Sequence, residues 1–202
     1  MFFRKKADFS EDDLNSVIIA CEAKNARAQK ALIKLFLGYA KSICMHYSGN
    51  IQEAEEIMND GFLKVFNNIS KYDHSRPFKL WLRSIFINTA LDHYRKNKKH
   101  AHHINIDDLE IHDFSHDIIS KISAEEILLL VQSLPPSYRM VFVLYVVEGY
   151  THQEIAYMLD IGVGTSKSNL RDARRKLQVM IKNSYPHLYL AHSLKISKFH
   201  EN

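Results

Sequence analysis

One segment near the end of this chain, residues 150–177, constrains its fold more than any other. The segment reads YTHQEIAYMLDIGVGTSKSNLRDARRKL. Its first half carries Ile155, Ala156 and Leu159 at the spacing of one apolar helix stripe. The sequence DIGVG then interrupts this period, and its glycines tolerate the backbone angles of a tight turn. The pattern predicts two short helices joined by a turn.

The second helix of this pair is polar on one side. Leu170, Ala173 and Leu177 recur at i, i+3 and i+7 and should face inward, with Thr165 as the expected N-cap. At about 100° per residue, the solvent-facing side then carries Lys167, Ser168, Arg171, Arg174 and Arg175. A recognition helix is built in this way, because Arg and Lys contact base edges and phosphates in the major groove. The alternative is an ordinary solvated helix, and the adjoining helix and turn favour DNA binding.

Composition and charge bound the class of protein. A chain of 202 residues allows one or two domains, and the net charge of +4 comes with basic clusters at residues 95–99 and 167–176. Cys21 and Cys44 lie among apolar residues without metal-ligand spacing, so we expect reduced, buried thiols in a cytoplasmic protein. We expect no signal peptide and no membrane span, because no apolar run has the required character.

Long helical periods, with only four prolines and six glycines, predict an all-α protein. The expected helices of the first half begin at a Ser10 cap and then span residues 26–47, 52–68 and 78–98. Residues 100–120 are rich in His and Asp without a sustained period, which is typical of a linker. The predicted organisation is a domain over 1–99, a linker over 100–120, a second domain over 121–184 and a tail over 185–202.

The second domain should begin near Ser123, a suitable helix cap. Residues 140–147 are an unbroken apolar run, which a buried strand or a buried helix would explain. We favour the helix, because Pro135-Pro136 suits its start and Gly149 its end.

Three segments, taken in order, carry a family resemblance. They are EAEEIMNDGFLKVF (residues 53–66), KYDHSRPFKLWLRSIFINTALDHYRK (residues 71–96) and SLPPSYRMVFVLYVVEGYTHQEIAYMLDIGVGTSKSNLRDARRKL (residues 133–177). Together they resemble bacterial RNA polymerase sigma factors of the extracytoplasmic-function (ECF) class. The resemblance implies an all-α, two-domain, non-enzymatic cytoplasmic protein without a cofactor or metal. A region 2-like domain would dock on core polymerase and melt the −10 element, and a region 4-like helix-turn-helix domain would read the −35 element.

In the first segment an apolar stripe should be buried: Ala54, Ile57, Met58, Phe62 and Val65. The exposed positions include Glu53, Glu56, Asn59, Asp60 and Lys64. Taken by themselves, these charged residues would be interpreted as an ordinary solvent-exposed helix face. The resemblance implies instead that this face docks on the clamp helices of the largest polymerase subunit. Asn59 and Asp60 stand where the family usually has Gln and Glu.

In the second segment, Trp81 follows core spacing and is interpreted as a packing residue rather than a base-stacking platform. The resemblance implies that a preceding loop captures a base flipped out of the −10 element, near Asn88. This loop consists of Asp73, His74, Ser75 and Arg76. Arg83 and Arg95 are expected phosphate contacts.

In the third segment the resemblance implies that Lys167, Ser168, Asn169 and Arg171 read bases beside Thr165, while Arg174 and Arg175 hold phosphates. Two residues depart from the family pattern. Ser166 replaces the usual Val, and its hydroxyl should bond a carbonyl one turn earlier. Asp172 replaces the usual Arg and should pair with Lys176 or Arg175. Both departures should alter the −35 sequence preference, while the chain should still bind DNA.

Two other functional classes remain as alternatives. A metalloenzyme could use His102, His103, His112 and His116 with Asp107, Asp108 and Asp113, but no apolar period would hold such ligands in place. A free-standing regulator could bind duplex DNA as a dimer, which would leave residues 53–66 and 71–96 without a role. The partners implied by the resemblance are core RNA polymerase, promoter DNA and a membrane-bound anti-sigma factor.

Overall fold

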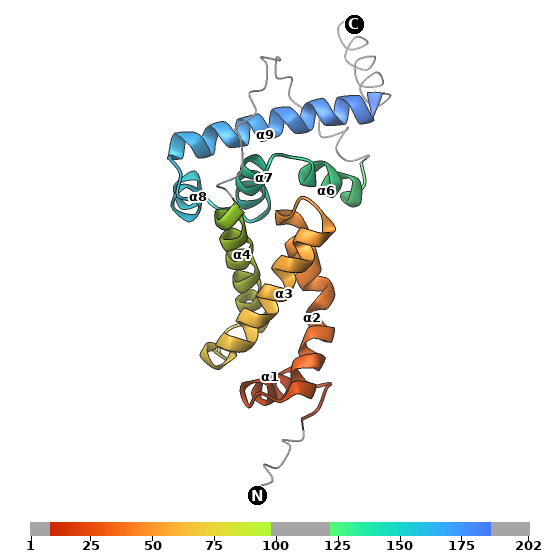
Figure 1. The fold of residues 1–202 in the computed structure, drawn as a ribbon, viewed down its shortest axis with the longest axis vertical. Coiled ribbons are helices and arrows are strands. Elements are labelled where there is room, and N and C mark those ends of the chain that lie inside the picture. Colours follow the sequence, from red (N-terminus) through yellow and green to blue (C-terminus); the bar gives the residue numbers. More distant parts are fainter. Residues whose placement is uncertain (1–8, 98–121, 187–202) are drawn as a thin grey trace, which may run out of the picture. The chain divides into compact units, whose positions relative to one another are not determined.

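The computed structural model describes residues 9–97 and 122–186, which contain helices and no strand (Figure 1). The expected all-α class is therefore confirmed. The chain divides into two compact units, Met1–Lys96 and Asn97–Asn202. The predicted linker with its His and Asp residues, and most of the predicted tail, lie outside the described residues. None of the described helices is long and apolar enough to cross a bilayer.

The described residues of the first unit form four α-helices and one short 3-10 turn. These are α1 (Leu14–Glu22), α2 (Ala26–Tyr47), α3 (Ile51–Asn68), η1 (Ile69–Lys71) and α4 (Phe78–Asn97). Helix α2 packs against both α1 and α3. The bounds of α2 match the prediction, and those of α3 and α4 each differ by one residue. Residues 26–47, 51–68 and 78–97 therefore form the helices that their periodicity predicted.

The predicted start of the first helix at a Ser10 cap is wrong. Helix α1 begins at Leu14, and its N-cap is Asp13, whose Oδ1 accepts the Asn15 N–H at 3.0 Å. The Ser10 N–H instead donates to Ser16 Oγ at 3.1 Å. A carboxylate next to the first apolar turn is an effective cap, and this places the helix start three residues later than Ser10 would.

Apolar residues of α1, α2, α3 and α4 form the core of the first unit. The stripe of α3 is buried as expected at Ala54, Ile57, Phe62 and Val65, whereas Met58 is only half-buried. Phe62 packs edge-on against Phe86 of α4, with ring centroids 5.2 Å apart. The α3 polar face is thereby turned away from the core.

The second unit contains α6 (Ala124–Gln132), α7 (Pro136–Phe142), a π-helical turn η3 (Val143–Val147), α8 (His152–Leu159) and α9 (Val163–Ser184). Ser123 caps α6 through a capping box with Glu126, as its sequence position suggested. Helix α9 packs against α6, α7 and α8. Helix α9 is therefore covered by three helices and not only by α8, its partner in the helix-turn-helix.

The apolar run at residues 140–147 is helical, as predicted, with Pro136 in the first position of α7. Gly149 has φ +78°, and the Tyr150 N–H bonds the Leu144 carbonyl at 3.0 Å, which closes the segment. The expectation that the whole run is buried is wrong. Its last three residues lie on the exposed π-helical turn: Tyr145, Val146 and Val147.

Candidate nucleic-acid interface

Helices α8 and α9 form the predicted helix-turn-helix. Thr151 caps α8 through a capping box with Glu154, and the Glu154 carboxylate accepts both the Thr151 N–H and hydroxyl at 2.8 Å. These bonds lower the pKa of Glu154. The helix ends at Asp160 in a left-handed conformation (φ +51°), and the Ile161 N–H returns to the Ala156 carbonyl at 3.0 Å. Helix α8 is thus held by hydrogen bonds at both of its ends.

The predicted N-cap at Thr165 is wrong, because α9 begins at Val163 with Gly162 as its cap. The Ser166 N–H already donates to the Gly162 carbonyl at 3.0 Å, so Thr165 lies inside the first turn. Thr165 remains exposed there. The two-glycine turn is consequently shorter than the sequence pattern indicated.

The solvent side of α9 keeps most of the predicted polar residues. Lys167, Arg171 and Arg174 are exposed, and Ser168 is half-buried. Together with Thr165 these residues are called the recognition face below. The predicted apolar back is confirmed, since Leu170, Ala173 and Leu177 are all buried. An exposed cationic face on a packed back can contact nucleic-acid phosphates and base edges.

Two predicted members of this face are buried instead. Asn169 is 6% exposed and Arg175 is 8% exposed. Periodicity placed Arg175 on the solvent side. The prediction fails because α9 packs against three helices, which bury more of its circumference than one apolar stripe. Both residues are therefore left out of the recognition face.

The two departures from the family pattern have partners that the sequence did not indicate. Ser166 is fully buried, as its inward position required, but its Oγ bonds His152 Nδ1 at 2.9 Å rather than a carbonyl one turn earlier. Asp172 pairs with Arg171, Nε to Oδ1 at 3.1 Å, and not with Lys176 or Arg175. Arg171 thus has a carboxylate beside it on the recognition face.

Sequence reasoning missed His152 and Tyr145 as neighbours of this face. Their rings stack with centroids 4.6 Å apart, and the Arg174 guanidinium carbon lies 5.9 Å from the Tyr145 ring centre. Burial lowers the pKa of His152, and the cations of Lys167 and Arg174 lower it further. The only sequence signal was a histidine at the start of the first helix of the pair.

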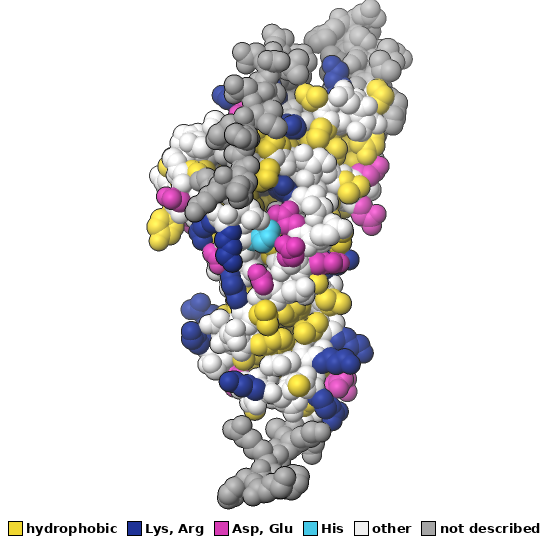
Figure 2. All heavy atoms as spheres, in the orientation of Figure 1, with side chains coloured by type: hydrophobic (Ala, Val, Ile, Leu, Met, Phe, Trp, Pro, Cys, Tyr) yellow, Lys and Arg dark blue, Asp and Glu magenta, His cyan; other side chains and the backbone are white. Residues whose placement is uncertain are grey.

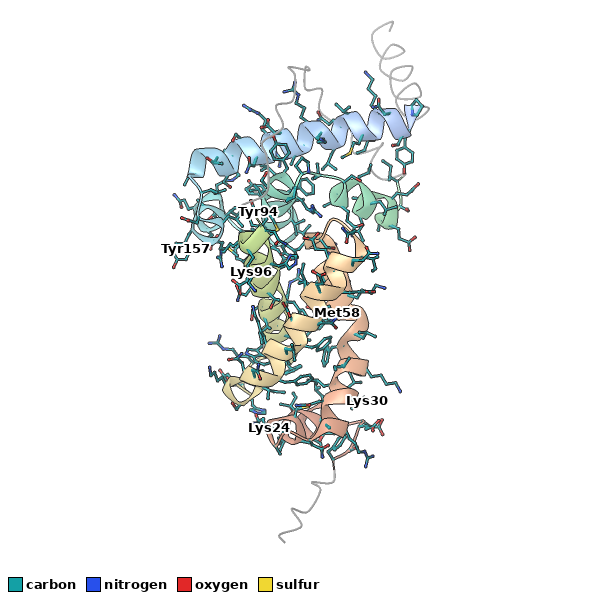
Figure 3. The ribbon with its side chains drawn as sticks, in the orientation of Figure 1. Lys24, Lys30, Met58, Tyr94, Lys96 and Tyr157 are labelled. Carbon is teal, nitrogen blue, oxygen red and sulfur yellow. The ribbon has the colours of Figure 1, made fainter. Side chains whose placement is uncertain are left out.

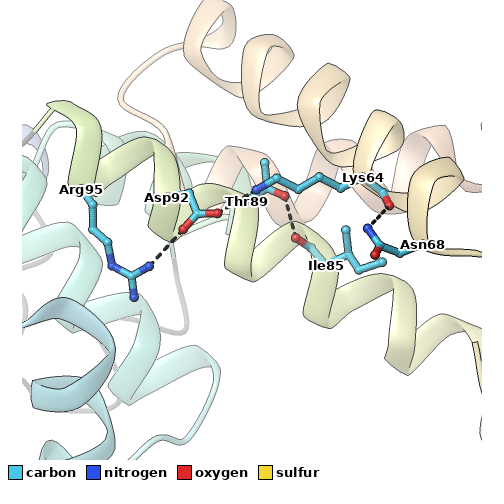
Figure 4. Close-up of polar contacts among 6 residues, drawn as sticks. All are labelled: Lys64, Asn68, Ile85, Thr89, Asp92 and Arg95. Carbon is cyan, nitrogen blue, oxygen red and sulfur yellow. Dashed lines mark hydrogen bonds and ion pairs between the residues drawn. The ribbon is translucent and has the colours of Figure 1, made fainter. Parts of the chain in front are cut away.

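The polar face of α3 is exposed at Glu56, Asn59 and Asp60, as predicted. On the face that Figure 2 displays, acidic side chains gather on one side of a histidine and basic side chains lie on its other side. Glu53 is half-buried, and its Oε2 accepts the Gly49 N–H at 2.6 Å. Lys64 reaches Asp92 of α4, with Nζ and Oδ2 2.7 Å apart (Figure 4). We call Glu53, Glu56, Asn59, Asp60 and Lys64 the acidic face.

A histidine of α4 contacts two carboxylates of the acidic face. His93 lies between two α3 carboxylates, with Nδ1 3.4 Å from Glu53 and Nε2 3.4 Å from Glu56. Its side chain is 17% exposed. The Glu53 and Glu56 carboxylates are therefore tied to α4, which limits their rotamers.

The loop before α4 is organised by Asp73. Its Oδ1 accepts the Ser75 N–H at 3.0 Å and the Ser75 hydroxyl at 2.7 Å, and these bonds lower the Asp73 pKa. Arg76 pairs with Asp73 Oδ2 at 3.3 Å, and His74 reaches Glu22 of α1 at 3.3 Å. All four loop side chains are exposed. They lie together at one end of α4, as the sequence predicted.

Trp81 packs behind this loop. Its ring centre lies 5.4 Å from each of Tyr72 and Phe78, which supports the packing interpretation. The other predicted −10 residues lie farther along α4. Asn88 is exposed, Arg83 is half-buried and Arg95 pairs with Asp92 at 3.0 Å. Arg95 follows the helix start by roughly 25 Å along the axis, so the structure does not bring it to the loop.

Exposed side chains also lie away from these faces. Tyr157 points outward from α8 and is 90% exposed, and Lys96 lies near the C-terminal end of α4 (Figure 3). The latter extends the basic end of the helix beyond Arg95.

Comparison with known proteins matches both units to one family. A family model described as Sigma-70 region 2 matches residues 32–100, and one described as Sigma-70, region 4 matches residues 124–177. Together they cover more than half of the chain.

Curated relatives agree with these matches. The chain is 25% identical over 166 residues to the ECF RNA polymerase sigma factor SigW of Bacillus subtilis, which covers 75% of this chain and 88% of that protein. It is 26% identical over 163 residues to the ECF RNA polymerase sigma-E factor of Escherichia coli K12, covering 74% and 85%.

Among solved structures, CnrH in complex with the cytosolic domain of CnrY matches with a TM-score of 0.42 and 19% identity, over 83% of this chain and 96% of that one. The sigma factor RpoE of Bartonella quintana, in complex with the anti-sigma factor NepR, gives 0.45 and 20% over 76% and 96%. From the two family models and the curated relatives, the chain belongs to the sigma-70 family as a sigma factor of the ECF class, which directs promoter-specific transcription.

Proposed function

We propose that the two units divide promoter recognition between them. The first unit binds core RNA polymerase through the acidic face and opens the −10 element with the loop before α4. The second unit reads the −35 element with the recognition face. The observation that carries this proposal is that each unit holds one family signature and exposes a charged face, acidic on α3 and cationic on α9. The chain itself performs no catalytic step and acts in the cytoplasm.

The acidic face suits a protein partner. Glu56, Asn59 and Asp60 are exposed along α3, and the His93 contacts limit the freedom of the adjacent Glu53 and Glu56. Restricted carboxylates lose less conformational entropy on binding than free ones. We infer that this face docks on the clamp helices of the largest polymerase subunit.

The loop with Asp73, His74, Ser75 and Arg76 suits a single-stranded base. Its backbone is held by Asp73, while its side chains present donors and acceptors to solvent. Capture of a flipped base needs such groups, because their hydrogen bonds offset the free energy lost when the base leaves the stack. We infer that this loop receives a −10 base. Asn88 and Arg83, which lie along α4, would support this contact, and Arg95 would bind phosphates farther along the same helix.

The recognition face suits the major groove. Lys167, Ser168 and Arg171 occupy its first turns, where base edges are read in helix-turn-helix proteins. Arg174 lies one turn later and is assigned to phosphate. Asn169 and Arg175 were expected here too, but their burial removes support for direct contacts.

The test combines polymerase association with transcription by the full chain. The double variant Glu56→Lys with Asp60→Lys should lose co-elution with bacterial core polymerase, because it reverses the charge of the acidic face. Glu125→Lys, which alters an exposed residue of α6, is the matched control and should co-elute normally. Normal co-elution of the double variant would remove the docking assignment.

For the recognition face, Lys167→Ala should weaken transcription selectively by promoter, by about 1–3 kcal/mol if Lys167 reads a base. The measurement is transcription from several promoters that the protein opens with polymerase. An equal loss at every promoter would reassign Lys167 to phosphate. No loss at any promoter would contradict its place in the interface.

A further proposed partner is an anti-sigma factor, since ECF sigma factors are commonly held by a membrane-tethered one. One of the solved structures named above is a sigma factor in complex with an anti-sigma factor, and the other is CnrH in complex with the cytosolic domain of CnrY. Affinity purification of the chain from its own cells tests this proposal, and recovery of polymerase without a further stoichiometric protein would count against it.

A further inference from the structure

His152 joins the two helices of the helix-turn-helix through one ring nitrogen. It is the first residue of α8, and its Nδ1 lies 2.9 Å from the Oγ of Ser166 in α9. Ser166 is completely buried, whereas the histidine is half-buried. Since Nδ1 faces the interior, Nε2 on the opposite side of the ring is directed away from Ser166.

An aromatic neighbour stacks on this ring, and a cation lies over that neighbour. Tyr145 of η3 stacks on His152 with an interplanar angle of 23°. The guanidinium carbon of Arg174 in α9 lies 5.9 Å from the centre of the Tyr145 ring. Arg174 and Tyr145 are both exposed. The imidazole is thus held at the edge of the recognition face.

The charges around His152 are cations on the neighbouring helix. Lys167 and Arg174 of α9, together with burial, lower its pKa below the ordinary value. From η3 it faces the phenol ring of Tyr145, and on its own helix Glu154 is engaged with Thr151. Two cations oppose a third positive charge, and an approaching phosphate would reverse this effect by favouring the imidazolium.

Ser166 can support both protonation states of the ring. A hydroxyl donates to Nδ1 when the imidazole is neutral and accepts from Nδ1–H when it is charged. In both cases Nε2 carries a proton and serves as a donor. The family's usual Val at this position could provide neither bond.

We propose that His152 is a further DNA contact, in which Nε2 donates to a backbone phosphate beside Lys167 and Arg174 and the contact strengthens when the ring is protonated. Ser166 is its positioning residue. The proposal rests on the proposed function of the recognition face. Proton uptake on binding then makes DNA affinity rise as pH falls through the histidine range, and makes this increment disappear at higher pH.

The experiment measures binding of the full chain to a labelled duplex of mixed sequence by fluorescence anisotropy. Salt dependence is recorded at about pH 5 and about pH 8, which bracket histidine titration. Each phosphate contact adds about 0.9 to the slope of log affinity against log salt, or roughly a threefold larger loss of affinity for a fourfold rise in salt. Circular dichroism at both pH values checks that every variant is folded.

At about pH 5, the slope of log affinity against log salt should be steeper for the wild-type chain than for His152→Gln, by about 0.9. The increment is the rise in this slope between about pH 8 and about pH 5. The control His46→Gln alters a histidine of α2 and should retain the wild-type increment. Ser166→Ala should lose much of the increment although His152 is present, because the ring is no longer positioned. An increment unchanged in His152→Gln would overturn the proposal, and one unchanged in Ser166→Ala would overturn the positioning role.

Failure of the proposed function has a different signature. If the recognition face does not bind DNA, Lys167→Ala and Arg174→Ala will bind the duplex as wild type does at both pH values. That result would overturn the interface and this inference with it. Weakened binding by those two variants, together with a wild-type pH response in His152→Gln, would overturn the His152 contact alone.

Discussion

Gly61 of α3 and Phe86 of α4 approach so closely that a Cβ atom on Gly61 would lie 2.3 Å from Cε1 of the Phe86 ring. Phe86 is fully buried, and Phe62 packs against its edge at 5.2 Å. The ring therefore has little room to move aside. This glycine lets the helix that bears the acidic face pack tightly on α4.

We expect Gly61→Ala to lower the free energy of unfolding of the first unit by about 1–3 kcal/mol, because the added methyl overpacks the core. Trp81 is the only tryptophan in the sequence, so its fluorescence during urea unfolding reports this unit. Gly38→Ala is the matched control, since a Cβ there meets no described atom within 4 Å. It should stabilise α2 by about 0.5–1 kcal/mol. Equal effects of the two changes would contradict the close packing.

Asp172 should weaken DNA binding by its own recognition helix. Its Oδ1 lies 3.1 Å from Arg171 Nε, so it partly neutralises that arginine and would repel a nearby phosphate. Asp172→Asn should therefore bind duplex DNA roughly threefold more tightly at moderate salt, the effect of about one phosphate contact. Anisotropy titration measures this change. Asp160→Asn, in the turn before α9, provides a control of equal charge change, and tighter binding by both variants alike would indicate a general charge effect.

The Thr151–Glu154 capping box should make α8 sensitive to acid. The hydrogen bonds from Thr151 lower the pKa of Glu154. A lowered carboxyl pKa gives stability that is present above the ordinary glutamate pKa and lost as pH falls through the lowered value. Thermal unfolding is followed by circular dichroism at several acidic pH values. Glu154→Gln should reduce the fall of the unfolding temperature as the pH is lowered, which is the acid side of its pH dependence. Glu125→Gln, an exposed acid next to the α6 capping box, should leave that side unchanged. A wild-type acid response in Glu154→Gln would contradict the prediction.

Both cysteines should be unreactive in the folded protein. Burial raises the pKa of Cys21 to about 11 and that of Cys44 to about 12. Since the thiolate is the nucleophile, iodoacetamide at neutral pH should label neither thiol until the chain is unfolded. Mass spectrometry of native and urea-treated samples distinguishes the two states. Rapid labelling of native Cys44 would show that α2 opens.

Sequence periodicity and capping residues determined most of the local structure. The spacing of apolar residues placed α2, α3, α4 and the helix-turn-helix, because a helix with one apolar stripe must bury that stripe. Ser123 and the proline pair marked helix starts through interactions within a few residues. The helix at residues 140–147 was predicted in the same way. These features depend on neighbours in sequence, which a single chain displays directly.

Tertiary packing alone decided which polar residues remain available. Arg175 follows the same helical period as exposed residues, yet it is buried, as is Asn169, because three helices pack around α9. The Ser166 partner is His152, fourteen positions away in sequence, and His93 reaches two carboxylates on another helix. Spacing along one helix cannot specify such contacts, since they depend on the angle and distance at which separate helices meet.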